Sequence, residues 1–307
     1  MPDLSVIIPA RREMFAAKTA ENVLANARGD TEVILVLDGA WADPAVPDHP
    51  RLKVIHHSQA IGQRAATNEG ARLSQAKYIM KLDAHCAVDE GFDVKLMADC
   101  QPDWTMIPSM HNLHAFDWVC AGCGHRSYQG VQPKQCEQCQ QESAHTMDVI
   151  WKPRENRLTV SWRFDKNLQF QYWKNHSKRP EAQGPLIETM SFIGACMFLE
   201  RERFWALGGM DEAHGSWGQF GTEWALKTWL SGGKLISTRK TWFAHMFRTG
   251  NFSANGGSSW PYPITQGEID RARAYSRDLW LNDRWPLAKH KLAWLVEKFC
   301  PAPDWHE

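Results

Sequence analysis

The stretch KYIMKLDAHCAVDEGF, residues 77–92, changes its chemical character within a few positions. Its first part, from Tyr78 to Leu82, is short and mostly apolar, which predicts a buried β-strand. Asp83 and His85 follow at once, and side chains two positions apart share one face while the segment stays extended. A carboxylate and an imidazole on one face are able to hold one divalent ion such as Mn²⁺. The alternative is a capping Asp beside an unrelated His.

Further short apolar runs precede this strand and alternate with segments of helical character. In chain order these segments are residues 4–10, 13–27, 31–40, 52–57 and 62–76. The resulting order of strand, helix, strand, strand, helix and strand predicts an open, mostly parallel α/β sheet. Ligands of such sheets bind beyond the carboxyl ends of the strands. The polar residues at those ends are Arg11, Asp38, Asp83 and His85.

The composition is that of an ordinary globular protein with one large domain or two smaller ones. The 307 residues are 43% hydrophobic and 23% charged, and the formal net charge is zero, which implies no global electrostatic partner. The amino-terminal sequence lacks the basic and apolar regions of a signal peptide. No stretch approaches the ~20 apolar residues that span a bilayer. These features predict a cytoplasmic protein without a membrane span, from a bacterial or virus-infected cell.

Four of the eight cysteines form two C-x-x-C pairs that are separated by twelve residues. They are Cys120, Cys123, Cys136 and Cys139. This spacing is typical of a zinc ribbon, in which two turns supply four thiolates to one tetrahedral Zn²⁺. Four thiolates leave no open coordination position, so the zinc is expected to be structural. The alternative is four unliganded thiols.

A basic and aromatic segment follows the cysteine pairs. Residues 151–183 contain eight Lys or Arg against three Asp or Glu, a net charge of +5. Residues 268–298 add +2 (seven against five), so the rest of the neutral chain carries about −7. Rings such as Trp162 and Trp173 interleave with the basic residues, which is typical of a nucleic-acid surface. The alternative is a solvated basic face above ordinary core aromatics.

Several motifs, in order along the chain, resemble those of one enzyme family. LDAHC resembles the D-x-H metal motif of polypeptide N-acetylgalactosaminyltransferases and, more broadly, the D-x-D motif of family-2 glycosyltransferases, which share the GT-A fold. The other similar segments are VIIPARRE (6–13), VLDGA (36–40), GQRAATNEGA (62–71, with Thr in place of the family's Arg), IGACMFLERERFWALGGMDEAHGSWG (193–218) and EWALKTWLSGGKLISTRKTWFAHMFR (223–248). The resemblance covers residues 4–110 and 188–248, well over half of the chain.

The resemblance implies a donor site. Asp83 and His85, together with His245, would bind Mn²⁺ or Mg²⁺, and the ion would hold the donor diphosphate and neutralise charge on the leaving UDP. Asp38 would contact the uracil or the ribose, and three arginines would hold or close over phosphate. Besides Asp83, the residues expected at the nucleotide sugar are Pro9, Arg11, Asp38, Gly62, Arg64, Asn68 and Arg248.

The chain departs from the family where a catalytic base is expected. The segment G-E-N-x-E of the N-acetylgalactosaminyltransferases is replaced by Gln-Phe-Gly-Thr-Glu at residues 219–223. Glu223 is therefore the favoured base, and the pair Asp211 and Glu212 is the alternative. A retaining enzyme without such a base is the third possibility. The lectin domain that follows in many of those enzymes is not expected in this chain.

Together these inferences predict a GT-A fold, Rossmann-like with a mostly parallel open sheet, a zinc-ribbon insertion and a helical C-terminal extension. The expected function is transfer of a sugar from a UDP-sugar to a hydroxyl, with a hydroxymethylated pyrimidine of phage DNA as the favoured acceptor. A saccharide or protein hydroxyl is the alternative acceptor. A non-catalytic, nucleic-acid-binding zinc-ribbon protein on a GT-A scaffold is the alternative of another class. The expected divisions are 1–115 (nucleotide sugar), 116–148 (ribbon), 149–187 (basic segment), 188–250 (acceptor half) and 251–307 (helical extension).

Overall fold

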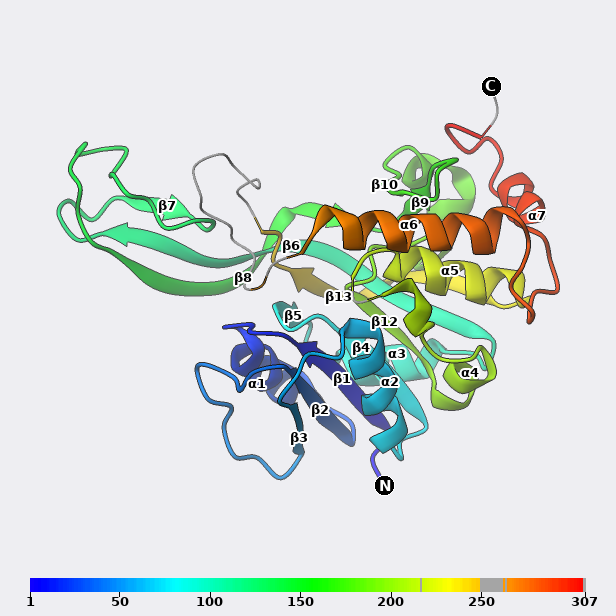
Figure 1. The fold of residues 1–307 in the computed structure, drawn as a ribbon, viewed down its shortest axis with the longest axis horizontal. Coiled ribbons are helices and arrows are strands. Elements are labelled where there is room, and N and C mark those ends of the chain that lie inside the picture. The colour runs from blue at the N-terminus through cyan, green and yellow to red at the C-terminus, as the bar shows by residue number, and fades with distance from the viewer. Residues whose placement is uncertain (216, 249–261, 263, 306–307) are drawn as a thin grey trace.

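The computed structural model describes residues 1–215, 217–248, 262 and 264–305. Its centre is one twisted sheet whose main strands lie in the order β11, β13, β6, β12, β4, β1, β2 and β3 (Figure 1). These strands are β1 (Leu4–Ala10), β2 (Thr31–Asp38), β3 (Leu52–His57), β4 (Tyr78–Leu82), β6 (Trp104–Cys120), β11 (Leu186–Glu188), β12 (Cys196–Glu200) and β13 (Lys234–His245). Attached to this path are β5 (Cys86–Val88), β7 (Arg126–Tyr128) and β8 (His145–Thr159), and a separate hairpin consists of β9 (Trp162–Phe164) and β10 (Phe170–Tyr172).

Helices cover the sheet on both sides and continue beyond it. They are α1 (Ala16–Asn26), α2 (Gln63–Leu73), α3 (Phe92–Asp99), α4 (Arg201–Ala206), α5 (Phe220–Leu230), α6 (Gln266–Leu281) and α7 (Leu292–Lys298). Short 3₁₀ turns are η1 (His176–Lys178), η2 (Pro180–Ala182) and η3 (Glu212–His214). None of the helices in the described ranges combines the length and the apolar character that a membrane crossing requires.

The amino-terminal half is the parallel part of the sheet. Strand β1 pairs in parallel with both β2 and β4, and β2 pairs in parallel with β3. Strands β2 and β4 are buried along their whole length. Continuous apolar runs are typical of parallel strands that are covered on both faces, which is why these segments do not alternate in polarity. The predicted open α/β arrangement is confirmed in this half.

Helix α2 packs closely on the sheet because its sequence is rich in small residues. A Cβ atom at Gly70 would lie 2.5 Å from Cγ2 of Ile7 in β1, so no larger side chain fits there without a shift. Asp38 at the end of β2 accepts hydrogen bonds from the backbone N–H groups of Ile61 and Gly62, which fixes the start of α2 beside the carboxyl end of β2. Gly62 and Gln63, at the start of that helix, are thereby placed at the predicted ligand edge.

The second half of the sheet is mixed. Strand β12 runs antiparallel to β4, whereas β13 runs parallel to β6 and antiparallel to β5. The β13–β5 register sets His245 opposite Cys86. Because His85 directly precedes Cys86, this pairing brings the last residue of β13 to the segment that follows β4.

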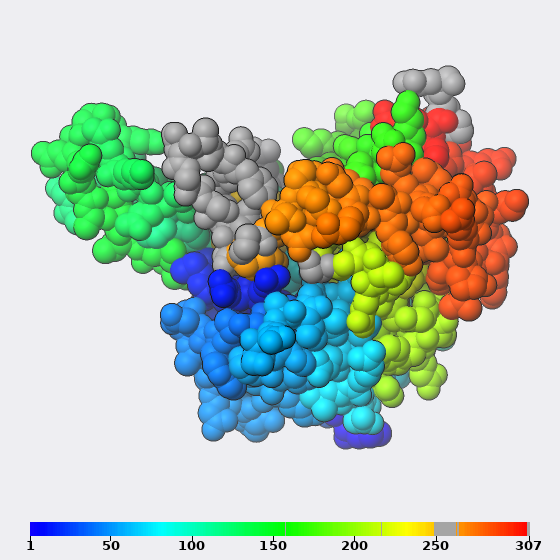
Figure 2. Space-filling view, in the orientation of Figure 1, coloured from blue at the N-terminus to red at the C-terminus, as the bar shows by residue number. Residues whose placement is uncertain are grey.

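A long arm projects from the sheet, at the left of Figures 1 and 2. Strands β6 and β8 pair antiparallel from Met110 opposite Thr159 to Cys120 opposite His145, with two register shifts. The two C-x-x-C turns lie at its tip. Strand β6 is continuous from the sheet into the arm, so the expected division between residues 115 and 116 falls inside one strand.

The C-terminal extension is helical, as predicted. Thr265 and Glu268 form a capping box that starts α6, each side chain accepting a hydrogen bond from the other residue's backbone N–H. Helix α6 lies over η3, and α7 packs on α5. Residues 249–261, where this extension was expected to begin, lie outside the described residues.

The basic segment is part of the folded body, and the two tryptophans expected to contact nucleic acid are core residues. Trp162 is fully buried and Trp173 is 3% exposed, so neither ring is available to stack on a base. Arg163 pairs with Asp304 at 2.7 Å, and Arg179 donates to the backbone carbonyl of Pro301 at 2.6 Å. The hypothesis that these two rings contact nucleic acid was therefore wrong, because the alternation of basic and aromatic residues comes from packing against the C-terminal tail.

Candidate active site

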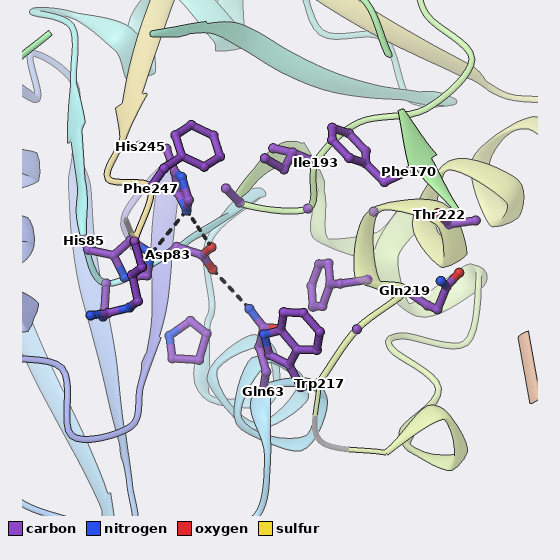
Figure 3. Close-up of a pocket in the computed structure, with 18 of the residues that line it drawn as sticks. Gln63, Asp83, His85, Phe170, Ile193, Trp217, Gln219, Thr222, His245 and Phe247 are labelled. Carbon is purple, nitrogen blue, oxygen red and sulfur yellow. Dashed lines mark hydrogen bonds and ion pairs between the residues drawn. The ribbon is translucent and has the colours of Figure 1, made fainter. Parts of the chain in front are cut away.

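A cavity of about 740 Å³ opens at the carboxyl ends of β1, β2 and β4. Figure 3 shows the two sides of its wall, with Asp83, His85 and His245 on one side and Gln219 and Thr222 on the other. The first side comes from the carboxyl ends of β4 and β13 and the start of β5, and the second comes from the start of α5. A ligand in this cavity would therefore contact both halves of the fold.

Three predicted metal ligands meet on the wall of this cavity. Asp83 follows β4, His85 precedes β5 and His245 ends β13, and one ligand atom from each lies within 4.8 Å of the others. The Nε2 atoms of the two histidines are 3.1 Å apart, and Asp83 Oδ2 lies 3.4 Å from His245 Nε2. The structure thus brings together residues that are 160 positions apart in the sequence.

The chemistry of these side chains fits a divalent metal ion. Burial lowers the pKa of His245 to about 4, so its ring is neutral near pH 7 and its nitrogen lone pair is available. Burial alone would raise the pKa of Asp83, but Lys81 and His245 hold it well below its usual range, so the carboxylate is ionised. Imidazole nitrogens and a carboxylate oxygen are ligands that Mn²⁺ accepts. This donor set faces the cavity.

The surrounding residues orient the cluster. Glu13 accepts a hydrogen bond from His85 Nδ1 at 3.0 Å and also pairs with Arg248. Since Nδ1 of His85 is engaged by the carboxylate, Nε2 is the nitrogen that faces His245. Burial alone would raise the pKa of Glu13, but His85 and Arg248 lower it overall. Glu13 was not predicted from the sequence; its place two positions after Arg11 at the end of the first strand was the available signal.

The two oxygens of Asp83 have different environments. Oδ1 accepts from Gln63 Nε2 at 3.0 Å and from the ammonium group of Lys81. Oδ2 faces His245. Neither Lys81 nor Gln63 was identified from the sequence, because a Lys inside an apolar strand and a Gln at the start of a helix are not informative by themselves.

Most of the predicted donor-site residues line the cavity: Pro9, Arg11, Asp38, Gly62, Asp83 and Arg248. Asp38 accepts hydrogen bonds from the backbone N–H groups of Ile61 and Gly62, at 2.5 and 3.0 Å. This pair of bonds ties the end of β2 to the start of α2. The Arg11 guanidinium lies 4.5 Å from the centre of the Tyr262 ring.

Arg64 and Asn68 lie elsewhere. Arg64 is 1% exposed and donates to Glu223 at 2.7 Å and to the carbonyl oxygens of Gly215 and Gly218. Asn68 exchanges hydrogen bonds with the backbone of Met210. Both side chains therefore hold the loop before α5 against α2. They support the wall of the cavity from behind.

The predicted bases are also outside the lining of the cavity. Glu223 is fully buried. It forms ion pairs with Arg64 and Lys227 and accepts a hydrogen bond from the backbone N–H of Asp211. Asp211 accepts from the Tyr275 hydroxyl at 2.9 Å, and Glu212 accepts from Asn68. Gly221 and Thr222 in the first turn of α5 line the cavity, whereas Glu223 points into the buried ion-pair network behind it.

The four cysteines converge at the tip of the arm. Their sulfur atoms all lie within 4.8 Å of one another, with 3.6 Å from Cys123 to Cys136 and 3.9 Å from Cys120 to Cys139. A tetrahedral Zn²⁺ with Zn–S bonds of about 2.3 Å places its sulfurs roughly 3.8 Å apart. The observed separations match that geometry. These residues fit a structural zinc that joins the two turns, at a distance from the cavity along the arm.

Comparison with known proteins identifies one family and a group of relatives. Residues 5–107 match the family described as Glycosyl transferase family 2. Polypeptide N-acetylgalactosaminyltransferase 8 of Drosophila melanogaster is 26% identical over 268 residues, which cover 82% of this chain and 39% of that protein. Human polypeptide N-acetylgalactosaminyltransferase 3 is 22% identical over 296 residues, which cover 92% of this chain and 42% of that protein. The chain thus spans about two fifths of the length of these curated relatives.

A solved structure shares the fold. The crystal structure of GalNAc-T7 with UDP, GalNAc and Mn²⁺ aligns with a TM-score of 0.64 at 18% identity, over 91% of this chain and 49% of that one. The architecture is the GT-A fold, with a mostly parallel open sheet, and the resemblance inferred from the motifs is confirmed.

Proposed function

We propose that this chain, a GT-A protein with a glycosyl transferase family 2 domain, is a metal-dependent glycosyltransferase that moves a sugar from a UDP-sugar to a hydroxyl group. The observation that carries the proposal is the convergence of Asp83, His85 and His245 on the wall of the cavity. The family match, residues 5–107, includes both Asp83 and His85. A similar protein has been crystallised with UDP, GalNAc and Mn²⁺.

The side chains that line the cavity would have different roles in binding the donor. When bound by the cluster, Mn²⁺ or Mg²⁺ would supply positive charge next to the donor's diphosphate. Arg11 and Arg248 line the same cavity and add fixed positive charge there. Asp38 and Gly62 also line the cavity and would orient the base and ribose of the nucleotide. Trp217 lies beside Gln63 on the wall of the cavity (Figure 3).

The carboxylates of the cavity favour a retaining enzyme. Among the described residues, those that line it are Glu13, Asp38, Asp83 and Asp165. The first three hold the cluster or the start of α2, as described above. Asp165 Oδ1 accepts from the backbone N–H groups of Asn167 and Gln169, and its Oδ2 accepts from Gln171. An inverting transfer needs a carboxylate that is free to take the proton of the acceptor hydroxyl. We infer that the transfer proceeds without such a base.

A protein or saccharide hydroxyl is the acceptor that fits best. The relatives are named as polypeptide N-acetylgalactosaminyltransferases, and the rings assigned to DNA contact are buried in the core. The arm segment 116–148 has two Lys or Arg against four Asp or Glu, so it offers no cationic path for phosphates. Phe170 and Trp217 line the cavity and provide flat apolar surface, which suits a sugar ring or a peptide.

The test of this function measures UDP release from a panel of UDP-sugars with Mn²⁺. Acceptors would be Ser- and Thr-containing peptides, simple glycans, and duplexes with and without hydroxymethylated pyrimidines, with products identified by mass. Transfer to a peptide or a glycan supports the proposal. Transfer to DNA alone would replace the proposed acceptor. A protein that binds UDP but turns over no UDP-sugar would favour the non-catalytic alternative.

A further inference from the structure

Lys81 is a fully buried lysine next to the predicted metal ligand Asp83. It lies in β4, two positions before Asp83, so both side chains share one face of the strand. Its ammonium group pairs with Asp83 Oδ1 and donates to the carbonyl oxygen of Gly194 at 2.8 Å. The same nitrogen lies 4.5 Å from the centre of the Phe220 ring. Lys81 therefore joins a predicted metal ligand to two segments of the cavity wall.

The contact with Lys81 limits which carboxylate oxygens of Asp83 a metal ion can reach. Oδ1 is occupied by Lys81 and by Gln63, whereas Oδ2 faces His245. The carboxylate is therefore arranged to offer one oxygen to an ion, together with the two imidazole nitrogens. The side chain of Asp83 cannot turn to offer both oxygens without breaking the contact of a buried ammonium, which is costly.

The cluster is also close to neutral in charge. Asp83 is paired with Lys81, and Glu13 is paired with Arg248. A divalent ion that entered alone would bring two positive charges to a cluster whose carboxylates are already compensated. The diphosphate of a donor carries negative charge that offsets the ion. The favourable order of events is therefore joint binding of the ion and the diphosphate.

We propose that Lys81 is a positioning residue that lowers the affinity of the empty site for divalent metal and so makes metal binding depend on the donor. This inference rests on the proposed use of a nucleoside-diphosphate donor. A unit charge about 5 Å from a divalent ion changes binding on the order of tenfold even when the interaction is weakened as strongly as in water. Neutralising Lys81 should therefore raise the affinity for Mn²⁺ in the absence of UDP by roughly tenfold or more.

The experiment measures Mn²⁺ binding by electron paramagnetic resonance, with and without saturating UDP. It compares the wild-type chain with Lys81→Gln, which keeps a hydrogen-bond donor, and with Lys81→Met, which does not. The matched control is Lys227→Gln. Lys227 is also buried and paired, with Glu223 at 2.9 Å and with the carbonyl oxygen of Gly209, but lies outside the metal cluster. Circular dichroism and thermal melting check that each variant is folded.

The expected result has two parts. In the wild-type chain, UDP should strengthen Mn²⁺ binding by about tenfold or more. In Lys81→Gln, Mn²⁺ should bind more tightly without UDP, so that UDP adds less, while Lys227→Gln should match the wild type. Equal Mn²⁺ affinity of the wild-type chain with and without UDP would overturn the inference, and this part needs no variant. A folded Lys81→Gln with wild-type affinity would overturn it too.

The same measurements separate this inference from the proposed function. A wild-type chain that binds neither Mn²⁺ nor UDP contradicts the glycosyltransferase proposal itself. A chain that binds both and transfers sugar, but whose Mn²⁺ affinity is unaffected by UDP and by Lys81→Gln, contradicts only the role of Lys81.

Discussion

His85 Nε2 lies 3.1 Å from His245 Nε2, although 160 positions separate the two residues in the sequence. The contact depends on the antiparallel pairing of β5 with β13, which sets the last residue of β13 beside the end of the parallel half. The cluster therefore forms only when both halves of the sheet are assembled. The contact between His85 and His245 therefore requires the complete sheet.

The first prediction concerns the metal. Asp83→Ala should abolish sugar transfer and weaken Mn²⁺ binding. Among the described residues, Asp83 is the only carboxylate in the cluster with the two histidines, and its Oδ2 faces His245. Removal of metal with EDTA should inhibit the wild-type chain, and Mn²⁺ should restore it. Transfer is measured by UDP release and metal binding by electron paramagnetic resonance. Asp270→Ala, on the exposed face of α6, is the control. A folded Asp83→Ala chain with full activity would refute the assignment.

The sequence predicted the parts of this site that depend on local spacing. Asp83 and His85 were found because two residues after an apolar strand share a face. His245 was found only through the resemblance, since nothing in the sequence alone relates the end of β13 to β4. The fold of the amino-terminal half was predictable from its apolar runs, whereas the antiparallel pairings of β12 and β13 depend on long-range contacts.

Other predicted residues lie away from the cavity, for a physical reason. Arg64, Asn68 and Glu223 occupy motif positions, but which face of a helix meets the cavity depends on how that helix packs. Here they form a buried network behind the wall. Lys81 was read as part of a strand, because its burial against Asp83 and Gly194 cannot be inferred from neighbouring residues. The roles predicted for Arg64, Asn68 and Glu223 stay predictions.

The second prediction concerns the cysteine cluster. Cys136→Ser should remove zinc and loosen the arm, because Zn²⁺ in small thiolate sites contributes on the order of 10 kcal/mol to folding. UDP binding should persist, since the donor site is formed by other strands. Zinc content by elemental analysis and UDP affinity by calorimetry measure the two effects. Cys100→Ser, at a buried thiol outside the cluster, should keep its zinc. Wild-type protein purified without zinc would contradict this prediction.

The third prediction concerns stereochemistry. Because every described carboxylate that lines the cavity is engaged by other groups, the product should keep the anomeric configuration of the donor sugar. Proton NMR of the product formed at early times, compared with that of the donor, decides this from the coupling constant of the anomeric proton. An inverted product would show that a base operates, and Asp165, the carboxylate near the acceptor side, would be the first residue to test.

The last prediction separates a structural Glu223 from a catalytic one. Glu223 is fully buried between Arg64 and Lys227, so Glu223→Gln leaves two buried cations short of a partner and should lower the free energy of unfolding by roughly 3–5 kcal/mol. Glu202→Gln, at an exposed position of α4, should change it by less than about 0.5 kcal/mol. Urea unfolding measures both.

The stability that Glu223 contributes should depend on pH in a direction set by its pKa. Burial alone would raise the pKa of Glu223, but Lys227 and Arg64 hold it below the ordinary value of 4.5. A carboxyl group whose pKa is lower in the folded state stabilises the fold above its unfolded pKa, and this contribution is lost as the pH falls through the folded value. The difference in stability between the wild-type chain and Glu223→Gln should therefore be full at pH 6–7 and shrink below about pH 4.5. If Glu223 were also the base, the variant that is still folded would bind UDP but lose its turnover.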